Sequence, residues 1–110
     1  MKSTVCTNKP MYATSSDAPR TYTFDEAMAY ARKLDEDGHQ DWRVPTKGEL
    51  NVLFNNRAAI GGFDVTGSGP AGSYWSSSQY DKWVAWCHNF SGATQNLDGT
   101  LIHSYLRCVR

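Results

Sequence analysis

Apolar side chains recur with the spacing of an α-helix between residues 24 and 35. The members of this stripe are Phe24, Ala27, Met28, Ala31 and Leu34. They lie three or four residues apart, which places them on one helix face while the charged residues between them face water. Thr23 and Glu26 have the spacing of a capping box, so the helix is expected to begin after Thr23. Gly38 can adopt the left-handed conformation and is predicted to end this helix.

A second helix is predicted from the same signals further along the chain. Thr46 and Glu49 form another capping box directly after Pro45. The apolar stripe that follows consists of Leu50, Leu53 and Phe54. Because the stripe stops there, this helix should end near residues 55–56.

Three short segments in the last third of the chain are rich in aromatic and β-branched residues, as strands are. They are residues 74–78, 83–90 and 104–109. Turn-forming dipeptides separate them, notably Ser91-Gly92 and Asp98-Gly99, so three antiparallel strands joined by hairpins fit best. Two helices followed by such a meander predict an α+β fold, with the helices packed on a small twisted antiparallel sheet.

The rest of the chain carries weaker structural signals. Residues 1–21 are predicted to form an N-terminal arm that donates an edge strand near Val5 or Tyr12, with the single domain proper at residues 22–110. Residues 57–73 are rich in glycine, which favours an irregular loop with a short strand near residues 63–65.

Alternation along the second strand segment divides its side chains between two faces. If Trp86 and Phe90 face the core, Trp83 and Cys87 are expected to point outward. An exposed tryptophan beside Tyr80 is suited to stacking on a sugar ring or to filling a pocket in a protein. The alternative is that Trp83 only covers the edge of the sheet.

Composition narrows the classes of function. The 110 residues suit one domain, and Lys+Arg and Asp+Glu both number 11, so the overall charge predicts neither a nucleic-acid nor an anionic-membrane partner. No apolar stretch approaches the ~20 residues of a transmembrane helix, and the first residues do not resemble a signal peptide, so we expect no membrane insertion. The three cysteines, Cys6, Cys87 and Cys108, do not match a disulfide-built secreted scaffold.

Three sequence elements that occur in order carry a resemblance to a known family. They are Asp41-Trp42-Arg43-Val44-Pro45-Thr46, Tyr74-Trp75-Ser76-Ser77-Ser78 and the end Arg107-Cys108-Val109-Arg110. From about residue 22 onward the chain resembles the Lcl C-terminal domain family of bacterial collagen-like adhesins. The resemblance implies a C-type-lectin-like fold that binds a ligand, and it implies no enzymatic activity. It extends to the variable proteins of diversity-generating retroelements, in which a C-terminal stretch of sheet and loop is diversified for binding.

The chain departs from the family pattern at two points. Family members often place a cysteine in the first helix that can pair with the cysteine of the last element, but Ala31 stands at that position, so Cys108 lacks this partner. The calcium signatures of sugar-binding C-type lectins are also absent, which argues against calcium-dependent sugar binding. Within the first element we expect structural roles, with Trp42 in the core and Arg43 held by a carboxylate.

The candidate site is the sheet face and the loops of the C-terminal third. Its candidate ligand-binding residues are Gln79, Tyr80, Lys82, Trp83, His88, Gln95, Leu97, Leu101, His103 and Tyr105. Aromatic side chains supply buried area to an interface, and amide, imidazole and ammonium groups supply directional hydrogen bonds. We therefore expect a non-catalytic module that recognises a protein or glycan, with no cofactor, no metal and no nucleic-acid partner.

Two other classes of function are alternatives. Cysteine and histidine side chains at Cys87, His88, His103 and Cys108 are of the types that bind zinc or act as nucleophiles. Because formylglycine-generating enzymes share the broader lectin-like fold, a small thiol- or metal-dependent enzyme is the catalytic alternative. The spacing matches no known zinc knuckle, however, and adjacent strand residues face opposite sides. The other alternative is a structural domain of an adhesin that assembles as a homo-oligomer, such as a trimer.

Two further features have competing interpretations. Cys87 and Cys108 could form a cross-strand disulfide if their strands are neighbours and the environment is oxidising. Basic side chains could form a patch for sulfated polysaccharide, although scattered charges usually serve solubility alone. The members of that patch would be Lys47, Lys82, Arg107 and Arg110. The compartment does not follow from this sequence, and a cell-surface or extracellular location is only what an adhesin would imply.

Overall fold

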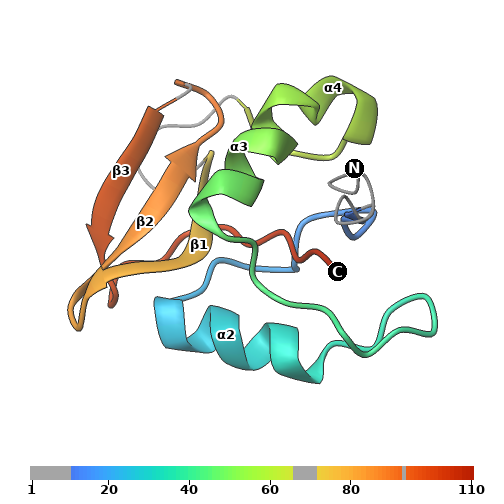
Figure 1. The fold of residues 1–110 in the computed structure, drawn as a ribbon, viewed down its shortest axis with the longest axis horizontal. Coiled ribbons are helices and arrows are strands. Elements are labelled where there is room, and N and C mark those ends of the chain that lie inside the picture. The colour runs from blue at the N-terminus through green and yellow to red at the C-terminus, as the bar shows by residue number, and fades with distance from the viewer. Residues whose placement is uncertain (1–10, 66–71, 93) are drawn as a thin grey trace, which may run out of the picture.

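The computed structural model describes residues 11–65, 72–92 and 94–110 (Figure 1). Its elements are α2 (Phe24–Lys33), α3 (Lys47–Asn55), α4 (Arg57–Ile60), β1 (Ser73–Asp81), β2 (Val84–Asn89) and β3 (Thr94–Gly99). The strands form one antiparallel sheet in the order β1-β2-β3, so the predicted α+β class is confirmed. None of the helices in these ranges is long and apolar enough to cross a membrane.

Helix α2 begins where predicted and ends earlier. The Thr23 hydroxyl accepts a hydrogen bond from the Glu26 N–H (3.3 Å), and the Glu26 carboxylate accepts one from the Thr23 N–H (3.0 Å), which confirms the capping box. The helix stops before Leu34, which takes an extended conformation (ψ 130°) and packs on the core. Gly38 lies beyond the helix, in a turn where it and Asp37 both have positive φ (76° and 55°). The prediction that Gly38 caps the helix is therefore wrong.

Helix α3 begins at the second capping box, as predicted. The Thr46 hydroxyl accepts from the Glu49 N–H (3.2 Å), and Glu49 accepts from the Thr46 N–H (2.9 Å). Both terminal nitrogens of Arg43 donate to the same carboxylate, at 2.5 and 2.7 Å, which confirms the expected partner of Arg43. These Arg43 hydrogen bonds are the main reason that the pKa of Glu49 falls to about 2. Trp42 is buried as expected, and its indole N–H donates to the Glu36 carbonyl (3.1 Å).

The glycine-rich segment after α3 holds a short helix that the sequence did not predict. Helix α4 follows directly on α3 and ends at Gly61, whose φ is 80°. Residues 63–65, all described, form no strand, so that prediction is wrong. Phe63 instead packs its ring on those of Tyr74 and Phe90, with centroids 5.5 and 4.8 Å apart. This contact belongs to the core beneath α3.

The third strand of the sheet is not the one predicted. All six residues of β3, TQNLDG, pair with β2 in unbroken register. The segment 104–109 instead pairs one residue at a time with Tyr22, Tyr74 and Arg43. The prediction failed because β3 is a polar edge strand with half its surface in water, whereas segment 104–109 is apolar because it runs through the core.

Two apolar cores lie on the two faces of the sheet. Trp75, Ala85 and Cys87 pack with α2 on one face, and Tyr74 and Phe90 pack with α3 on the other. Cys87 is 1 % exposed, so the prediction that it points outward is wrong. Because helices cover both faces, alternation along β2 separates two buried sets of side chains instead of a buried set from an exposed one.

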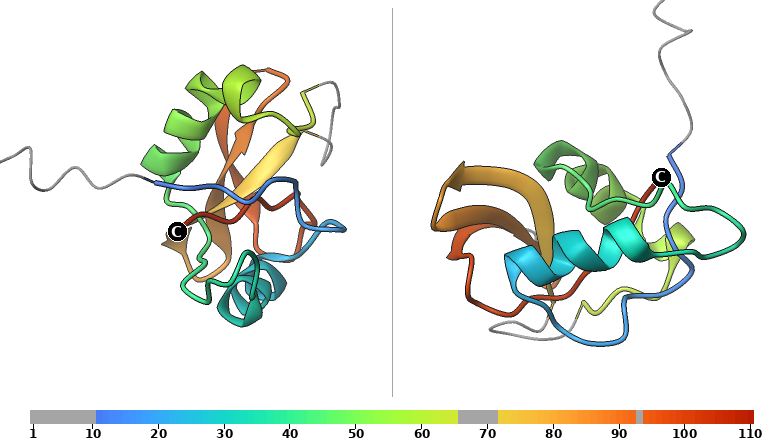
Figure 2. Two further views of the ribbon diagram at one scale, coloured as in Figure 1. Left: turned by 90° about the vertical axis from the view of Figure 1, so that its right-hand side faces the viewer. Right: turned by 90° about the horizontal axis from the view of Figure 1, so that it is seen from below.

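The N-terminal arm and the C-terminal end lie side by side (Figure 2, left). Tyr12 and Arg110 exchange two backbone hydrogen bonds, each 2.9 Å long. The pairing continues at the bridge between Ala13 and Val109. Near Tyr12 the arm therefore forms an isolated bridge and not an edge strand, while Val5, the other predicted position, lies outside the described residues.

A buried cluster around Arg107 ties the arm to the sheet. Arg107 is 0 % exposed, its terminal nitrogens donate to the Gly61 carbonyl (2.6 and 3.1 Å), and its guanidinium lies 4.1 Å from the centre of the Phe63 ring. Asp17 lies 3.5 Å from Arg107 Nε and accepts a hydrogen bond from the Tyr74 hydroxyl (2.5 Å). Burial raises the pKa of Asp17 and lowers that of Arg107. Arg107 therefore cannot belong to a surface basic patch.

Candidate functional site

Large apolar side chains stand exposed at the end of the sheet where the β1–β2 hairpin turns; Figure 1 shows the position of this hairpin. They are Tyr80, Trp83, Leu97, Leu101 and Ile102, which are 66, 63, 40, 79 and 51 % exposed. We call this surface the distal patch. The β1–β2 hairpin supplies the two aromatic residues, and β3 and the turn after it supply the aliphatic ones. Grouped apolar exposure of this kind is typical of an interaction surface.

Backbone hydrogen bonds hold the hairpin against the turn that follows β3. The Trp83 N–H donates to the Asp81 carboxylate (2.8 Å), and the Trp83 carbonyl accepts from the Thr100 N–H (2.9 Å). The turn itself is closed by the Ile102 N–H, which donates to the Gly99 carbonyl (3.0 Å). The side chains of the distal patch therefore stand on a backbone that is already ordered.

Strand β1 bends before it reaches the hairpin. Its pairing with β2 shifts register on both sides of Gln79, as happens at β-bulges. The hairpin consequently curls away from the body of the domain (Figure 2, right). None of the patch residues lines the hollows that lie beside α2, α3 and the arm.

Two lysines flank the distal patch. The ammonium of Lys82 lies 5.0 Å from the centre of the Trp83 ring, and that of Lys47 lies 3.6 Å from the centre of the Trp86 ring. Because Trp86 is paired with Leu97 across the strands, Lys47 adjoins the patch. Neither ammonium has a carboxylate oxygen within 4.0 Å among the described residues. Cation–π contacts thus keep positive charge beside the aromatic rings.

The structure brings together more than half of the predicted ligand-binding residues. Those at the distal end are Gln79, Tyr80, Lys82, Trp83, Leu97 and Leu101. Two residues absent from the predicted set, Ile102 and Lys47, complete this surface. The neighbouring Leu101 could have indicated Ile102, but no local signal indicates Lys47, which reaches the patch only because α3 packs on the sheet. Ligand binding by these residues stays a prediction.

The other predicted residues lie elsewhere in the fold. They are His88, Gln95, His103 and Tyr105. The Gln95 amide donates to the Lys47 carbonyl (2.9 Å) beneath the start of α3, and Tyr105 is half-buried. His103 faces α2, with its Nε2 3.8 Å from the Glu26 carboxylate. The ten predicted ligand-binding residues therefore do not form one surface.

His88 is buried in the core, so the expectation that it is displayed to a ligand is wrong. It is 2 % exposed, and its ring lies 4.9 Å from that of Phe54 and 5.1 Å from that of Phe90. Neither ring nitrogen has a hydrogen-bond partner among the described residues. Burial lowers the pKa of His88, because the charged imidazolium loses its hydration there.

We expect the domain to lose stability as the pH falls below about 6.5. In the unfolded chain His88 takes up a proton near its ordinary pKa of 6.5, whereas the folded protein resists this protonation. The unfolded state therefore binds more protons in this window, and the free energy of unfolding decreases as the pH falls. Urea denaturation at pH 7.5 and pH 5 measures the effect.

The control variants for this prediction are His88→Phe and His39→Gln. Phenylalanine preserves the ring packing and removes the titrating group, so His88→Phe should flatten the pH dependence between pH 7.5 and pH 5. His39 is exposed, and its replacement should leave the pH dependence as in the wild type. The same slope in the wild type and His88→Phe would show that another group causes it.

Neither of the two cysteines in the described ranges offers a reactive thiol at the surface. Cys87 and Cys108 are both buried and free, so the disulfide considered between them is not formed. Burial raises the pKa of Cys87 far above its ordinary value and that of Cys108 to about 12. Thiols with such a pKa stay protonated and react slowly. In the part of the chain that the structure describes, no group of three or more His, Cys, Asp or Glu side chains could hold a metal ion.

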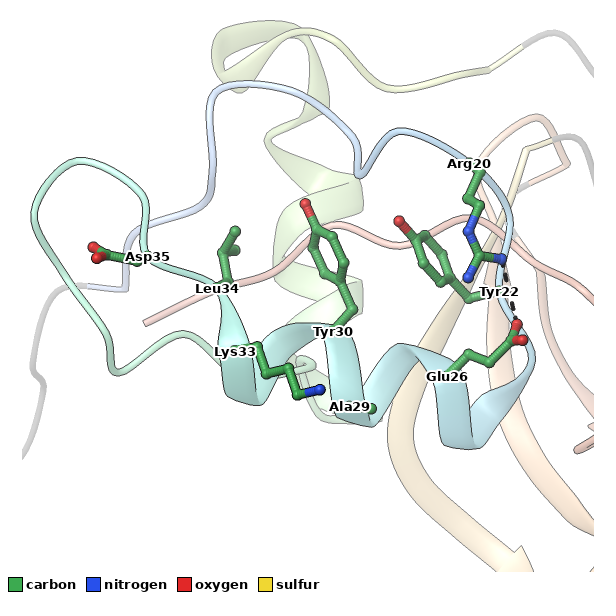
Figure 3. A pocket seen from close by; sticks show the side chains of 8 residues that line it. All are labelled: Arg20, Tyr22, Glu26, Ala29, Tyr30, Lys33, Leu34 and Asp35. Carbon is green, nitrogen blue, oxygen red and sulfur yellow. Dashed lines mark hydrogen bonds and ion pairs between the residues drawn. The ribbon is translucent and has the colours of Figure 1, made fainter.

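A shallow pocket of about 380 Å³ lies beside α2 (Figure 3). Its lining consists of Arg20, Tyr22, Glu26, Ala29, Tyr30, Lys33, Leu34 and Asp35. Arg20 pairs with Glu26 at 3.4 Å, and its guanidinium lies 4.3 Å from the centre of the Tyr22 ring. These groups bind one another at one end of the pocket, so fewer of them are free for a ligand. The sequence did not indicate this pocket.

Comparison with known proteins adds a family match. The sequence model of the Lcl C-terminal domain matches residues 4–110. The match includes most of the N-terminal arm, upstream of residue 22 where the resemblance was expected to begin. Among curated proteins, none matches this chain.

Proposed function

Because the chain belongs to the Lcl C-terminal domain family, as its motifs predicted, we propose that it is a non-catalytic recognition module of an adhesin. In this proposal the distal patch binds a protein or glycan ligand. The observation that carries the proposal is the exposure of five large apolar side chains at one end of the sheet. The family suggests an adhesin-like domain and does not name the ligand.

The chemistry of the distal patch suits recognition. Tyrosine and tryptophan dominate binding hot spots because each buries a large area with few rotatable bonds. Tyr80 and Trp83 are 66 and 63 % exposed on a backbone held by the hydrogen bonds of the hairpin. Little conformational entropy is then lost when a ligand covers them.

We infer further that the fold is C-type-lectin-like and that its C-terminal third serves as a display surface, as in the variable proteins of retroelements. Two helices packed on a small antiparallel sheet support the first inference. The second is supported by the division of residues 74–110 into buried framework, such as Trp75 and Val109, and exposed side chains, such as Trp83 and Leu101.

We propose no catalytic role for Cys87, His88 or Cys108. A catalytic nucleophile needs a general base within hydrogen-bond reach and access to substrate. All three side chains are buried, and the contact of the Cys87 thiol is the Ser104 hydroxyl at 3.8 Å. His88 lies on the opposite face of β2 from Cys87, in the other core. These observations support recognition over the enzyme alternative.

The proposal is tested by selecting binders of the immobilised domain from a displayed library of small folded scaffolds and from a glycan array. The paired variant Tyr80→Ala/Trp83→Ala should weaken the selected binders on the order of 10- to 100-fold, because it removes two aromatic anchors. Its thermal midpoint should stay within about 2 °C of the wild type, because both side chains are largely exposed.

The matched control is Tyr12→Ala/Val52→Ala, which removes two side chains of similar exposure, 54 and 49 %, outside the distal patch. This variant should retain the affinity of the wild type for most binders. Light scattering on each variant checks that self-association does not cover the patch. If the control variant weakens binding and Tyr80→Ala/Trp83→Ala does not, the site lies elsewhere and the proposal fails.

A further inference from the structure

The proposed function allows a protein or a glycan as ligand, and the distal patch favours one of them. We propose that the patch inserts into an apolar cleft of a partner protein whose rim carries carboxylates. This inference rests on the proposed function and specifies its partner. The shape, the side-chain chemistry and the charge of the patch each support it.

The shape of the patch is convex. The hairpin projects from the domain (Figure 2, right), and the patch residues do not line the hollows beside α2, α3 and the arm. Small ligands such as short sugars bind in hollows, where side chains surround them. A projecting surface is buried only by a partner that has a matching cleft. Folded proteins offer clefts of this kind.

The aliphatic side chains of the patch also favour a protein. Leu97, Leu101 and Ile102 are 40, 79 and 51 % exposed beside the aromatic residues. An aromatic ring can stack on the apolar face of a sugar, whereas leucine and isoleucine gain mainly by removing water from another apolar surface. A glycan would leave most of Leu101 in water, while a protein cleft would bury it.

Two polar side chains of the hairpin beside the patch are already engaged. The Gln79 amide donates to the Asp81 carbonyl (3.3 Å), and the Asp81 carboxylate accepts from the Trp83 N–H (2.8 Å). Specific recognition of hydroxyl groups needs several directed donors and acceptors that are free to pair. The Gln79 amide and the Asp81 carboxylate are therefore less available to a sugar.

Two ammonium groups, those of Lys82 and Lys47, lie at the edge of the patch, and the Asp81 carboxylate lies in the same hairpin as Lys82. The ammonium groups of Lys82 and Lys47 have no carboxylate oxygen within 4.0 Å in the ranges that the structure covers. Cations at the rim of an apolar surface are complemented by Asp or Glu side chains on the partner. Such pairs mainly speed association, and salt screens them.

The test measures one paired and one single variant against the binders from the scaffold library and the glycan array. Leu101→Ser/Ile102→Ser removes aliphatic surface and keeps both aromatic anchors. We expect the selected scaffold binders to present an apolar surface that includes acidic residues. Their affinity for this variant should be at least about tenfold lower than their affinity for the wild type. Lys82→Glu should slow their association severalfold at low salt and less at high salt. Thermal midpoints confirm folding, and Leu101→Ser alone replaces the pair if the pair unfolds.

Each other outcome overturns a defined part of the inference. Glycan binding that Trp83→Ala abolishes and Leu101→Ser/Ile102→Ser leaves intact would overturn the protein partner while the proposed function stands. Scaffold binders at the patch that lack acidic residues and ignore Lys82→Glu would overturn the carboxylate rim. Binding that neither Tyr80→Ala/Trp83→Ala nor Leu101→Ser/Ile102→Ser changes would overturn the inference together with the proposed function.

Discussion

Replacing Arg107 with methionine should lower the free energy of unfolding by about 3–5 kcal/mol, because it breaks a buried charge pair. The guanidinium donates to the Gly61 carbonyl at 2.6 Å and lies 3.5 Å from the Asp17 carboxylate. Without it, Asp17 keeps its partly buried charge and the Phe63 ring loses a cation 4.1 Å from its centre. Urea denaturation at neutral pH measures the loss.

The matched control is Arg110→Met, at the same C-terminal end. Arg110 binds Asp41 at 2.9 Å, but that carboxylate is 67 % exposed, so the variant should lose only a small fraction of the stability that Arg107→Met loses. Adding Asp17→Asn to Arg107→Met should recover part of the loss, since the unpaired carboxylate is then gone. Equal losses for the two arginine variants would contradict the role given to the buried cluster.

Replacing Trp75 with alanine should lower the free energy of unfolding by about 3–5 kcal/mol, because it leaves a large cavity in the core between the sheet and α2. Trp75 is 0 % exposed, its indole N–H donates to the Tyr22 carbonyl at 2.6 Å, and its ring meets the edge of Phe24 at 5.7 Å. Chemical denaturation followed by circular dichroism measures the change.

Trp83→Ala is the control that removes the same side chain from the distal patch. Because Trp83 is 63 % exposed, this variant should change stability by no more than about 0.5 kcal/mol. The two tryptophans lie in one aromatic run of the sequence. The prediction distinguishes Trp75, a core residue, from Trp83, an exposed residue that a ligand can contact. A loss at Trp83→Ala as large as that at Trp75→Ala would make Trp83 part of the core and remove it from the binding surface.

The starts of α2 and α3 could be predicted from the sequence because their signals are local. Thr23 with Glu26 and Thr46 with Glu49 satisfy amides within one helical turn, so spacing alone indicates where each helix begins. Strand β3 could not be predicted in this way. Its residues become a strand through pairing with β2, and an edge strand in water needs no apolar alternation.

The exposed half of the candidate site followed from the sequence, and the buried half did not. Tyr80 and Trp83 stand beside a tight hairpin, where large side chains have few neighbours. Alternation places Cys87 and His88 on opposite faces of β2, but it cannot reveal that α2 covers one face and α3 the other. Lys47 joins the patch through the packing of α3, which is a long-range contact without a local signal.

The most direct test of the distal patch as the recognition surface is a map of backbone amide chemical shifts in the ¹⁵N-labelled domain. The probe is the tightest scaffold binder that the library yields, titrated into the wild-type protein. The proposal predicts that the largest shifts fall in the hairpin around Tyr80 and Trp83 and in the turn around Leu101. Shifts confined to the α2 pocket around Tyr30, or to the arm around Tyr12, would contradict it.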